Sequence, residues 1–167
     1  ETPGIMQTCA GTVLLNQFRF RWYPLALARR RHDDGDEIHV LDPKTFEWRR
    51  PRNDADWDAH PYPYARADGG AFIHRSHDGG RTFTETVPID LGEYQAAFSP
   101  RGAIELSGEL HSGELLLAFG SHDHDPSGAA CVVRSSDDGR SWTKPAEVAR
   151  DPSRLFYESG AVECADG

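Results

Sequence analysis

The sequence predicts an all-β fold of short antiparallel strands, and three observations lead to this class. An eight-residue turn motif occurs twice, a strand pattern that begins with glycine recurs at nearly the same spacing, and no segment shows sustained helical periodicity. Strands joined by Gly turns leave edges and one face uncovered in each repeat. Each repeat therefore needs neighbours to bury its core.

The turn motif follows the pattern Ser-x-Asp-x-Gly-x-x-aromatic. Its pattern residues are Ser76, Asp78, Gly80 and Phe83 in the first copy and, 59 residues later, Ser135, Asp137, Gly139 and Trp142 in the second. The Asp side chain accepts hydrogen bonds from backbone N–H groups of its own turn, and Gly adopts the positive φ that closes it. Apolar runs at 71–73 and 130–133 precede the two copies. Each copy therefore predicts a strand, a rigid turn covered by the aromatic ring, and a returning strand.

The strand pattern that begins with glycine supports the same period. Residues 102–106 recur as 160–164, which lie 58 residues later, and residues 4–11 resemble 160–167. A period near 58 residues, made of short strands and Gly turns, indicates a β-propeller with about one blade per period.

The length bounds how much of a propeller is present. Six blades of this period would need roughly twice the 167 residues of the chain. We therefore expect one section of a six-bladed propeller over 1–167, with about two to three blades near 4–95, 100–155 and from 156 onward, and an insertion at about 24–70. The open blade edges would pair with the remaining blades or with a second copy of the chain.

Composition excludes some classes of partner. The net charge is −9, which argues against nucleic acid. No apolar run reaches the length of a membrane span, and no signal peptide is visible. The basic run Arg29, Arg30 and Arg31 is followed at once by acidic residues, so it is expected to be a solvated loop.

Further strands are expected from apolar runs between turn signals, at 12–15, 36–41, 46–48 and 114–119. Residues 42–45 and 111–113 are expected to be turns, and 49–70 a long loop. Trp57, His60, Tyr62 and Tyr64 give this loop aromatic and hydrogen-bonding groups suited to a sugar, or to pinning the loop down.

The doubled turn motif resembles the Asp-box, or BNR repeat, of sialidases and related propellers. The resemblance covers most of the chain outside residues 20–65, and it implies a six-bladed propeller that acts on carbohydrate. It also implies a secreted or periplasmic protein without cofactor or metal. Asp-boxes occur in propellers that are not sialidases as well, so the motif bears more strongly on the fold than on the reaction.

The resemblance also suggests catalytic residues. In residues 157–167 a glutamate precedes an apolar strand, a second glutamate follows five residues later, and an Asp-Gly turn comes next. Glu158 matches the family's catalytic glutamate, which takes the proton of a nucleophilic tyrosine. Asp68 is the nearest match to the general acid, with Asp54, Asp56 and Asp58 as further options.

The match to the substrate-binding arginines is incomplete. Glu1 and Thr2 stand where the family has the Arg and Ile of an Arg-Ile-Pro motif, and the two other arginines and the tyrosine would lie beyond Gly167. Arg19 and Arg21 alternate with aromatic residues on an expected strand and partly substitute in this interpretation. The alternatives are a propeller that binds carbohydrate without catalysis, and another glycosidase or a polysaccharide lyase on the same fold.

Two clusters contain side chains that can bind metal, but neither has the pattern of a metal site. The short spacing of His122 and His124 supplies only two ligands, and residues 33–37 do not match the spacing of an EF-hand. Both are expected to be solvated loops. The three cysteines show no metal-binding spacing and are expected to be packed strand thiols.

Overall fold

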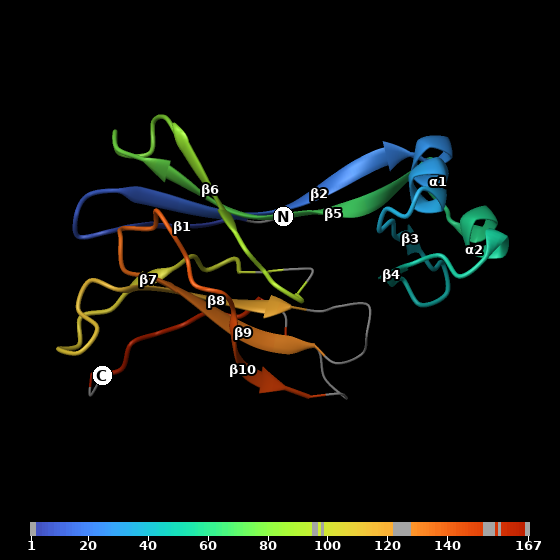
Figure 1. The fold of residues 1–167 in the computed structure, drawn as a ribbon. Helices are drawn as coiled ribbons and strands as arrows, with labels where there is room; N and C mark the ends of the chain where they lie inside the picture. Colours follow the sequence, from blue (N-terminus) through green and yellow to red (C-terminus); the bar gives the residue numbers. More distant parts are fainter. Residues whose placement is uncertain are drawn as a thin grey trace. The chain divides into compact units, whose positions relative to one another are not determined.

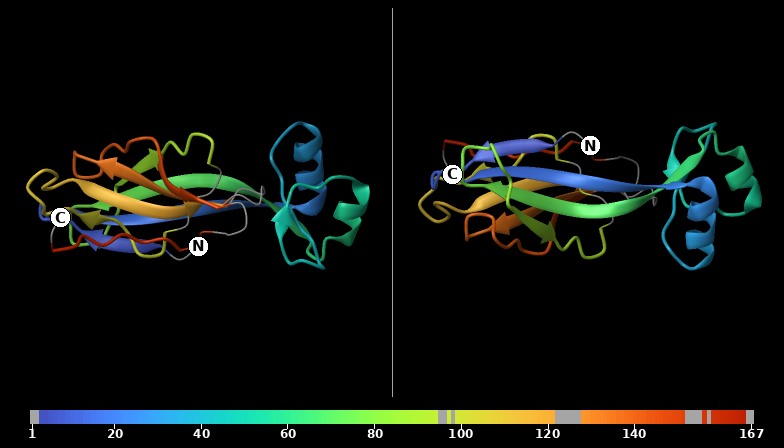
Figure 2. Two further views of the ribbon diagram at one scale, coloured as in Figure 1. Left: turned by 90° about the horizontal axis from the view of Figure 1, so that it is seen from below. Right: turned by 90° about the horizontal axis from the view of Figure 1, so that it is seen from above.

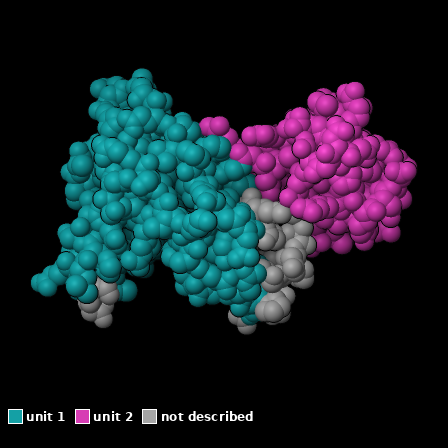
Figure 3. Space-filling model, viewed as in Figure 1, with its two compact units in different colours: residues 1–18, 70–167 teal, residues 19–69 magenta. Residues whose placement is uncertain are grey.

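The computed structural model describes residues 3–94, 97, 99–121, 128–151, 156 and 158–165. Within these residues the chain forms ten strands and two short helices. The strands form antiparallel sheets, none of them closed among the described residues, so the predicted all-β class is confirmed. The chain divides into two compact units, unit 1 with residues 1–18 and 70–167 and unit 2 with residues 19–69 (Figure 3).

Two four-stranded sheets contain most of the strands (Figure 1). The first has the order β1 (Gly4–Gln7), β2 (Val13–Pro24), β5 (Tyr64–Ser76) and β6 (Glu85–Ile89). The second has the order β10 (Ala146–Arg150), β9 (Ala129–Ser135), β8 (Leu115–Ser121) and β7 (Ile104–Glu105). The β8 and β9 strands pair from Leu115 opposite Ser135 to Ser121 opposite Ala129, and they lie side by side in every view (Figure 2).

The core of unit 1 follows the alternation of side chains along these strands. Leu14 and Phe18 of β2 and Ile73 of β5 are buried, as are Leu117 and Phe119 of β8. Burial of each such side chain contributes about 1.5–3 kcal/mol relative to exposure. The apolar runs that predicted strands are therefore the residues that hold unit 1 together.

The two repeated turns have the same hydrogen bonds. In the first, the Ser76 hydroxyl accepts from the N–H of Gly80 (2.9 Å), and the Asp78 carboxylate accepts from the N–H and hydroxyl of Thr82 (2.9 and 2.6 Å). In the second, the Ser135 hydroxyl accepts from the N–H of Gly139 (2.9 Å), and the Asp137 carboxylate accepts from the N–H and hydroxyl of Ser141 (2.9 and 2.6 Å).

The Asp side chains of these turns have pKa values well below the usual value for Asp. Hydrogen bonds from the hydroxyl and N–H of Thr82 lower the pKa of Asp78 to about 2. Burial works against ionisation of Asp137, but the hydrogen bonds from Ser141 and Ser135 outweigh it, and the pKa of Asp137 is also about 2. The indole of Trp142 donates back to the carbonyl of Gly139 (3.3 Å), so the half-buried ring covers its own turn.

Each turn contains two successive residues with positive φ. The first turn uses Gly79 (φ 73°) and Gly80 (φ 84°), whereas the second uses Asp138 (φ 61°) and Gly139 (φ 79°). A side chain in this region costs roughly 1–2 kcal/mol, although Asp tolerates it better than most residues. The second turn therefore has an Asp in a backbone conformation that glycine would adopt without strain.

Asp138 links the two sheets of unit 1. Its carboxylate accepts hydrogen bonds from the hydroxyls of Thr8 (2.8 Å) and Thr12 (2.6 Å) and from the guanidinium of Arg75 (3.0 Å). Arg75 is fully buried, and it also donates to the carbonyl of Asp138 (3.1 Å) and to Glu85. Burial opposes ionisation of Asp138, but the hydrogen bonds from Thr12, Thr8 and Arg75 outweigh burial and lower its pKa. We refer to these residues as the Asp138 node.

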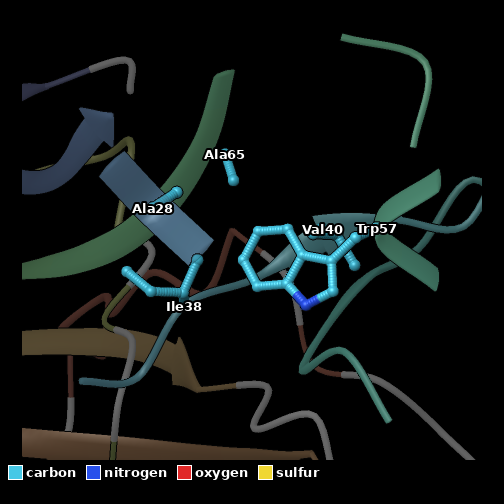
Figure 4. Packing of buried hydrophobic residues seen from close by; sticks show 5 residues of the cluster. All are labelled: Ala28, Ile38, Val40, Trp57 and Ala65. Atoms are coloured by element: carbon cyan, nitrogen blue, oxygen red, sulfur yellow. The ribbon is translucent and has the colours of Figure 1, made fainter. Parts of the chain in front are cut away.

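Unit 2 contains two helices that the sequence analysis did not predict, α1 (Leu25–Asp33) and α2 (Asp54–Ala59), and the small sheet of β3 (Val40–Leu41) and β4 (Trp48–Arg49). Its core consists of Ala28, Ile38, Val40, Trp57 and Ala65, and the indole of Trp57 lies among the four smaller side chains (Figure 4). Unit 2 thus has a hydrophobic cluster of its own.

Two predictions for this region were wrong. Arg29, Arg30 and Arg31 do not lie in a solvated loop but in α1, where good helix formers precede them and basic residues in the last turn suit the helix dipole. Residues 49–70 are not a long loop, because they include α2 and the start of β5. Asn53 caps α2 by accepting from the N–H of Asp56, which is a local signal for a helix start.

Two further expectations need correction. Residues 160–164 repeat the sequence of 102–106 but form no strand in the described part of the chain. Of the cysteines, only Cys131 on β9 is packed, whereas Cys9 and Cys164 are exposed, and all three are free thiols. Neither helix among the described residues is long and apolar enough to cross a bilayer.

Candidate functional site

The three segments that begin with glycine lie close together in unit 1. A Cβ added to Gly4 would be 1.9 Å from the backbone nitrogen of Gly102, and one added to Gly160 would be 2.6 Å from Cδ of Arg101. Because the first contact is with backbone, Gly4 must be a glycine for the two segments to approach so closely. Segments that are 58 or more residues apart in the sequence thus meet at one place.

Two glutamates fasten these segments to each other. The Glu105 carboxylate accepts from the N–H of Cys9 (2.6 Å). The Glu163 carboxylate accepts from the N–H groups of Ser107 and Gly108 (both 2.9 Å) and from the Ser107 hydroxyl (2.6 Å). These hydrogen bonds, led by the one from the Ser107 hydroxyl, lower the pKa of Glu163. Both carboxylates therefore hold backbone in place.

Glu158 is an exposed glutamate of this region. It has φ of 49° and is one of three non-glycine residues with positive φ in the described part of the chain. Such a conformation in a long side chain is strained, and strain of this kind concentrates at functional sites. Tyr157, Asp166 and Gly167, which belong to the same predicted motif, lie outside the described residues, as do Glu1, Thr2, His122 and His124.

The other predicted catalytic and charged residues belong to unit 2. Asp68 is a half-buried residue of β5, and Arg19 and Arg21 are exposed residues of β2. Asp68, Arg19 and Arg21 thus lie in unit 2, whereas Glu158 lies in unit 1.

Asp56 is unsuited to the general-acid role for which it was an option. It accepts two hydrogen bonds from Arg49 (both 2.7 Å) and two from the side chain of Arg52 (both 3.1 Å). These hydrogen bonds, led by those from Arg49, hold its pKa far below the usual range. A carboxylate that stays ionised has no proton to donate, so Asp56 is a structural residue beside α2. Asp54 is likewise paired, with Arg29 at 2.5 Å.

Tyr62 and Tyr64 lie in a cluster of aromatic rings in unit 2. The two tyrosine rings are stacked almost parallel, with centroids 5.6 Å apart and planes 4° apart. Trp48 stacks on Tyr62 (6.3 Å), and Trp22 meets Trp48 (5.4 Å) and Tyr64 (5.3 Å) edge to face. We call Trp22, Trp48, Tyr62 and Tyr64 the aromatic platform.

The platform rests on polar groups that are themselves fixed. His60 is buried, accepts from the N–H of Leu41 (3.0 Å) and contacts the carbonyl of Tyr64 (2.7 Å), while its ring packs on Trp48 and Tyr62. The guanidinium of Arg66 lies 4.7 Å from the Trp48 ring centroid. His60 and the core residue Trp57 therefore support unit 2, in line with the pinning alternative, whereas Tyr62 and Tyr64 face outward.

Trp22 and Trp48 belong to the aromatic platform although no local sequence pattern indicated it. Both stood in expected strands, but nothing local showed that β2 and β4 would bring them to the two tyrosines. The candidate metal cluster at 33–37 is explained by ion pairs, Arg31 with Asp36 (2.6 Å) and Arg50 with Glu37. No group of three or more metal-ligating residues occurs within the residues that the structure describes.

Comparison with known proteins shows a fold and no family. No protein-family model and no curated protein matches the sequence. Among solved structures, the chain is similar to a protein of unknown function from Dyadobacter fermentans DSM 18053, with a TM-score of 0.58 and 18% identity over 89% of this chain. The chain spans 36% of the length of that protein. This likeness supports a common fold alone.

Proposed function

We propose that the chain is a section of an Asp-box β-propeller whose whole form is a sialidase-like glycoside hydrolase. The observation that carries this proposal is the pair of turns with the same hydrogen bonds, 59 residues apart in the sequence. Each turn follows a strand of a different four-stranded antiparallel sheet. One four-stranded sheet per period is the arrangement of propeller blades.

The meeting of the glycine-leading segments supports the location of the site. In a propeller, corresponding strands of successive blades come together around the central channel. Residues near 4, 102 and 160 occupy corresponding positions in the repeat and lie against one another. Their loops are therefore where a substrate of the propeller would bind.

Glu158 is the proposed base for a tyrosine nucleophile. Its exposed carboxylate stands beside a segment that Glu163 fastens to the backbone of Ser107 and Gly108, which limits movement of the segment. A neutral phenol suits an anionic sugar, because it avoids placing a carboxylate nucleophile against the carboxylate of the substrate. Asp68 remains the proposed general acid.

The test is hydrolysis of a fluorogenic sialoside by the intact protein and by Glu158→Gln. We expect the substitution to reduce kcat by about 10²–10⁴-fold, the usual contribution of a general base. The matched control is Glu109→Gln, because Glu109 is an exposed glutamate of the same unit. A folded intact protein without turnover, or a Glu158→Gln variant as active as Glu109→Gln, would contradict the proposal.

A propeller that binds carbohydrate without cleaving it is the second candidate. It is favoured by the glutamate and threonine at positions 1 and 2, where a sialidase has Arg and Ile, because loss of a bidentate arginine weakens binding of the sialic acid carboxylate. Saturable binding of a glycan without released product would identify this candidate. An unsaturated uronate product would instead indicate a polysaccharide lyase.

A further inference from the structure

A ligand of the aromatic platform of unit 2 could contact only its outer surface, because no space is left between the rings. Ring centroids 5.3 Å apart (Trp22 and Tyr64) and 5.6 Å apart (Tyr62 and Tyr64) are contact distances for aromatic pairs. Nothing fits between rings at this separation, so the platform is not a cage for a cationic group. Trp22, Tyr62 and Tyr64 are nevertheless 49%, 42% and 40% exposed, so a ligand would contact the exposed parts of these rings.

The platform is rigid for a surface feature. Tyr62 stands between Pro61 and Pro63, and the Pro63 carbonyl accepts from the N–H of Leu25 (2.9 Å). His60 binds the backbone on both sides, at Leu41 and Tyr64. Ligand binding to a surface that is already ordered costs little conformational entropy.

The platform is also unnecessary for the hydrophobic core of unit 2. That core is formed by Ala28, Ile38, Val40, Trp57 and Ala65, and none of the four platform rings belongs to it. Exposed aromatic rings that a core does not require are typical of an interaction surface.

The polar groups of the platform restrict the class of ligand. The hydroxyls of Tyr62 and Tyr64 and the indole N–H of Trp22 have no hydrogen-bond partner within the residues that the structure describes. Tyrosine and tryptophan offer a flat apolar face and a polar tip. A pyranose ring has the complementary form, with an apolar C–H face and a rim of hydroxyls.

The size of the platform argues against a protein partner. Aromatic side chains have roughly 150–250 Å² of surface each, so three half-exposed rings offer about 300 Å². A stable protein interface needs about 800 Å² from each partner. Unit 2 also carries ten basic and ten acidic side chains, so its net charge favours neither an anionic nor a cationic partner.

We propose that the aromatic platform is a binding site for pyranoside oligosaccharides, whose C–H groups pack against the exposed parts of Tyr62, Tyr64 and Trp22. The site belongs to unit 2 and does not include Glu158. It binds sugar whether or not the protein hydrolyses a glycosidic bond, so it goes beyond the proposed function.

The experiment is calorimetric titration of the intact protein with three probes: a β-1,4-linked glucose hexasaccharide, a galacturonate hexasaccharide and sialyllactose. Tryptophan fluorescence is the second readout, because Trp22 is half-exposed within the platform. We expect saturable binding of at least one probe, with a change in tryptophan emission. Binding of the neutral probe alone, or of an acidic probe alone, supports the site and identifies the sugar type.

The variants separate this site from the proposed catalytic one. Tyr62→Ala and Tyr64→Ala are each expected to weaken binding at least tenfold, while Tyr62→Phe keeps the ring and stays within about threefold. The matched control is Phe46→Ala, because Phe46 is a 77% exposed aromatic residue of unit 2 outside the platform. Phe46→Ala is expected to bind like the parent.

Three outcomes would overturn the inference. They are a folded parent that binds none of the three probes, a Tyr62→Ala, Tyr64→Ala double variant that binds like the parent, and binding that is lost in Glu158→Gln but kept in the tyrosine variants. If the double variant fails to fold by circular dichroism, Trp22→Ala replaces it with the same expectation. Failure of the hydrolysis test leaves this inference untouched, because binding of the two hexasaccharides does not depend on cleavage of a sialoside.

Discussion

Removal of the Asp138 carboxylate is expected to lower the free energy of unfolding of unit 1, because this carboxylate connects its two sheets. The carboxylate accepts three side-chain hydrogen bonds, from Thr8, Thr12 and Arg75. Loss of one partner of a buried ion pair costs about 3–5 kcal/mol. Arg75 would keep Glu85 and the Asp138 carbonyl as acceptors, so the lower end of that range applies.

The choice of substituent refines the magnitude. Asp138→Gly removes the carboxylate but relaxes the positive φ, as Gly79 does in the first turn. Asp138→Ala removes the same carboxylate and leaves a Cβ in a strained conformation. We therefore expect a loss of about 3 kcal/mol for Asp138→Gly and about 1 kcal/mol more for Asp138→Ala.

The assay is urea unfolding followed by circular dichroism and by the fluorescence of Trp142, whose indole covers this turn. The control is Glu109→Ala, an exposed position expected to change the free energy of unfolding by less than about 0.5 kcal/mol. A double-mutant cycle with Arg75→Met should give a coupling energy above about 1 kcal/mol. Asp138→Gly within about 1 kcal/mol of the parent, or a coupling near zero, would refute the role of the node.

Three further outcomes are expected. Asp137→Asn should flatten the acid dependence of the melting temperature. The pKa of Asp137 is about 2 in the folded chain and about 3.9 in the unfolded chain, so its contribution to stability is complete above roughly pH 4 and falls as the pH is lowered toward 2. An equal drop in melting temperature at acid pH in variant and parent would contradict this. Gly4→Ala should destabilise unit 1 by about 3 kcal/mol or more, because its Cβ would meet the backbone of Gly102 at 1.9 Å. A Cβ at Gly108 would approach only a flexible side chain at 3.4 Å. Gly108→Ala is therefore the control with a small expected effect, and both variants are compared in thermal melts. Trp57→Ala should weaken unit 2 by about 3–5 kcal/mol, seen as faster hydrogen exchange in β3 and α2, and unchanged protection there would show that the indole is not central to that core.

Local signals predicted much of the fold because the interactions behind them are local. The hydrogen bonds of the repeated turns join residues four apart or fewer, so the motif itself specifies them. The buried strands β8 and β9 likewise follow from apolar runs. The missed helices are short, nine and six residues, which is too few for a clear helical period. The Asn53 cap was the available signal for the second.

The arrangement of distant residues could not be predicted in this way. Asp138 and Arg75 are 63 residues apart, and nothing around either one shows that the guanidinium of one ends on the carboxylate of the other.

The sequence by itself determined the all-β class and the two turns, because each depends on residues that are neighbours along the chain. Only the tertiary structure decided which carboxylates are fastened to backbone, which arginine is buried, and that Trp22 and Trp48 join Tyr62 and Tyr64 on one surface. The physical reason is that these contacts are made between strands, and the pairing of strands depends on the packing of the whole unit.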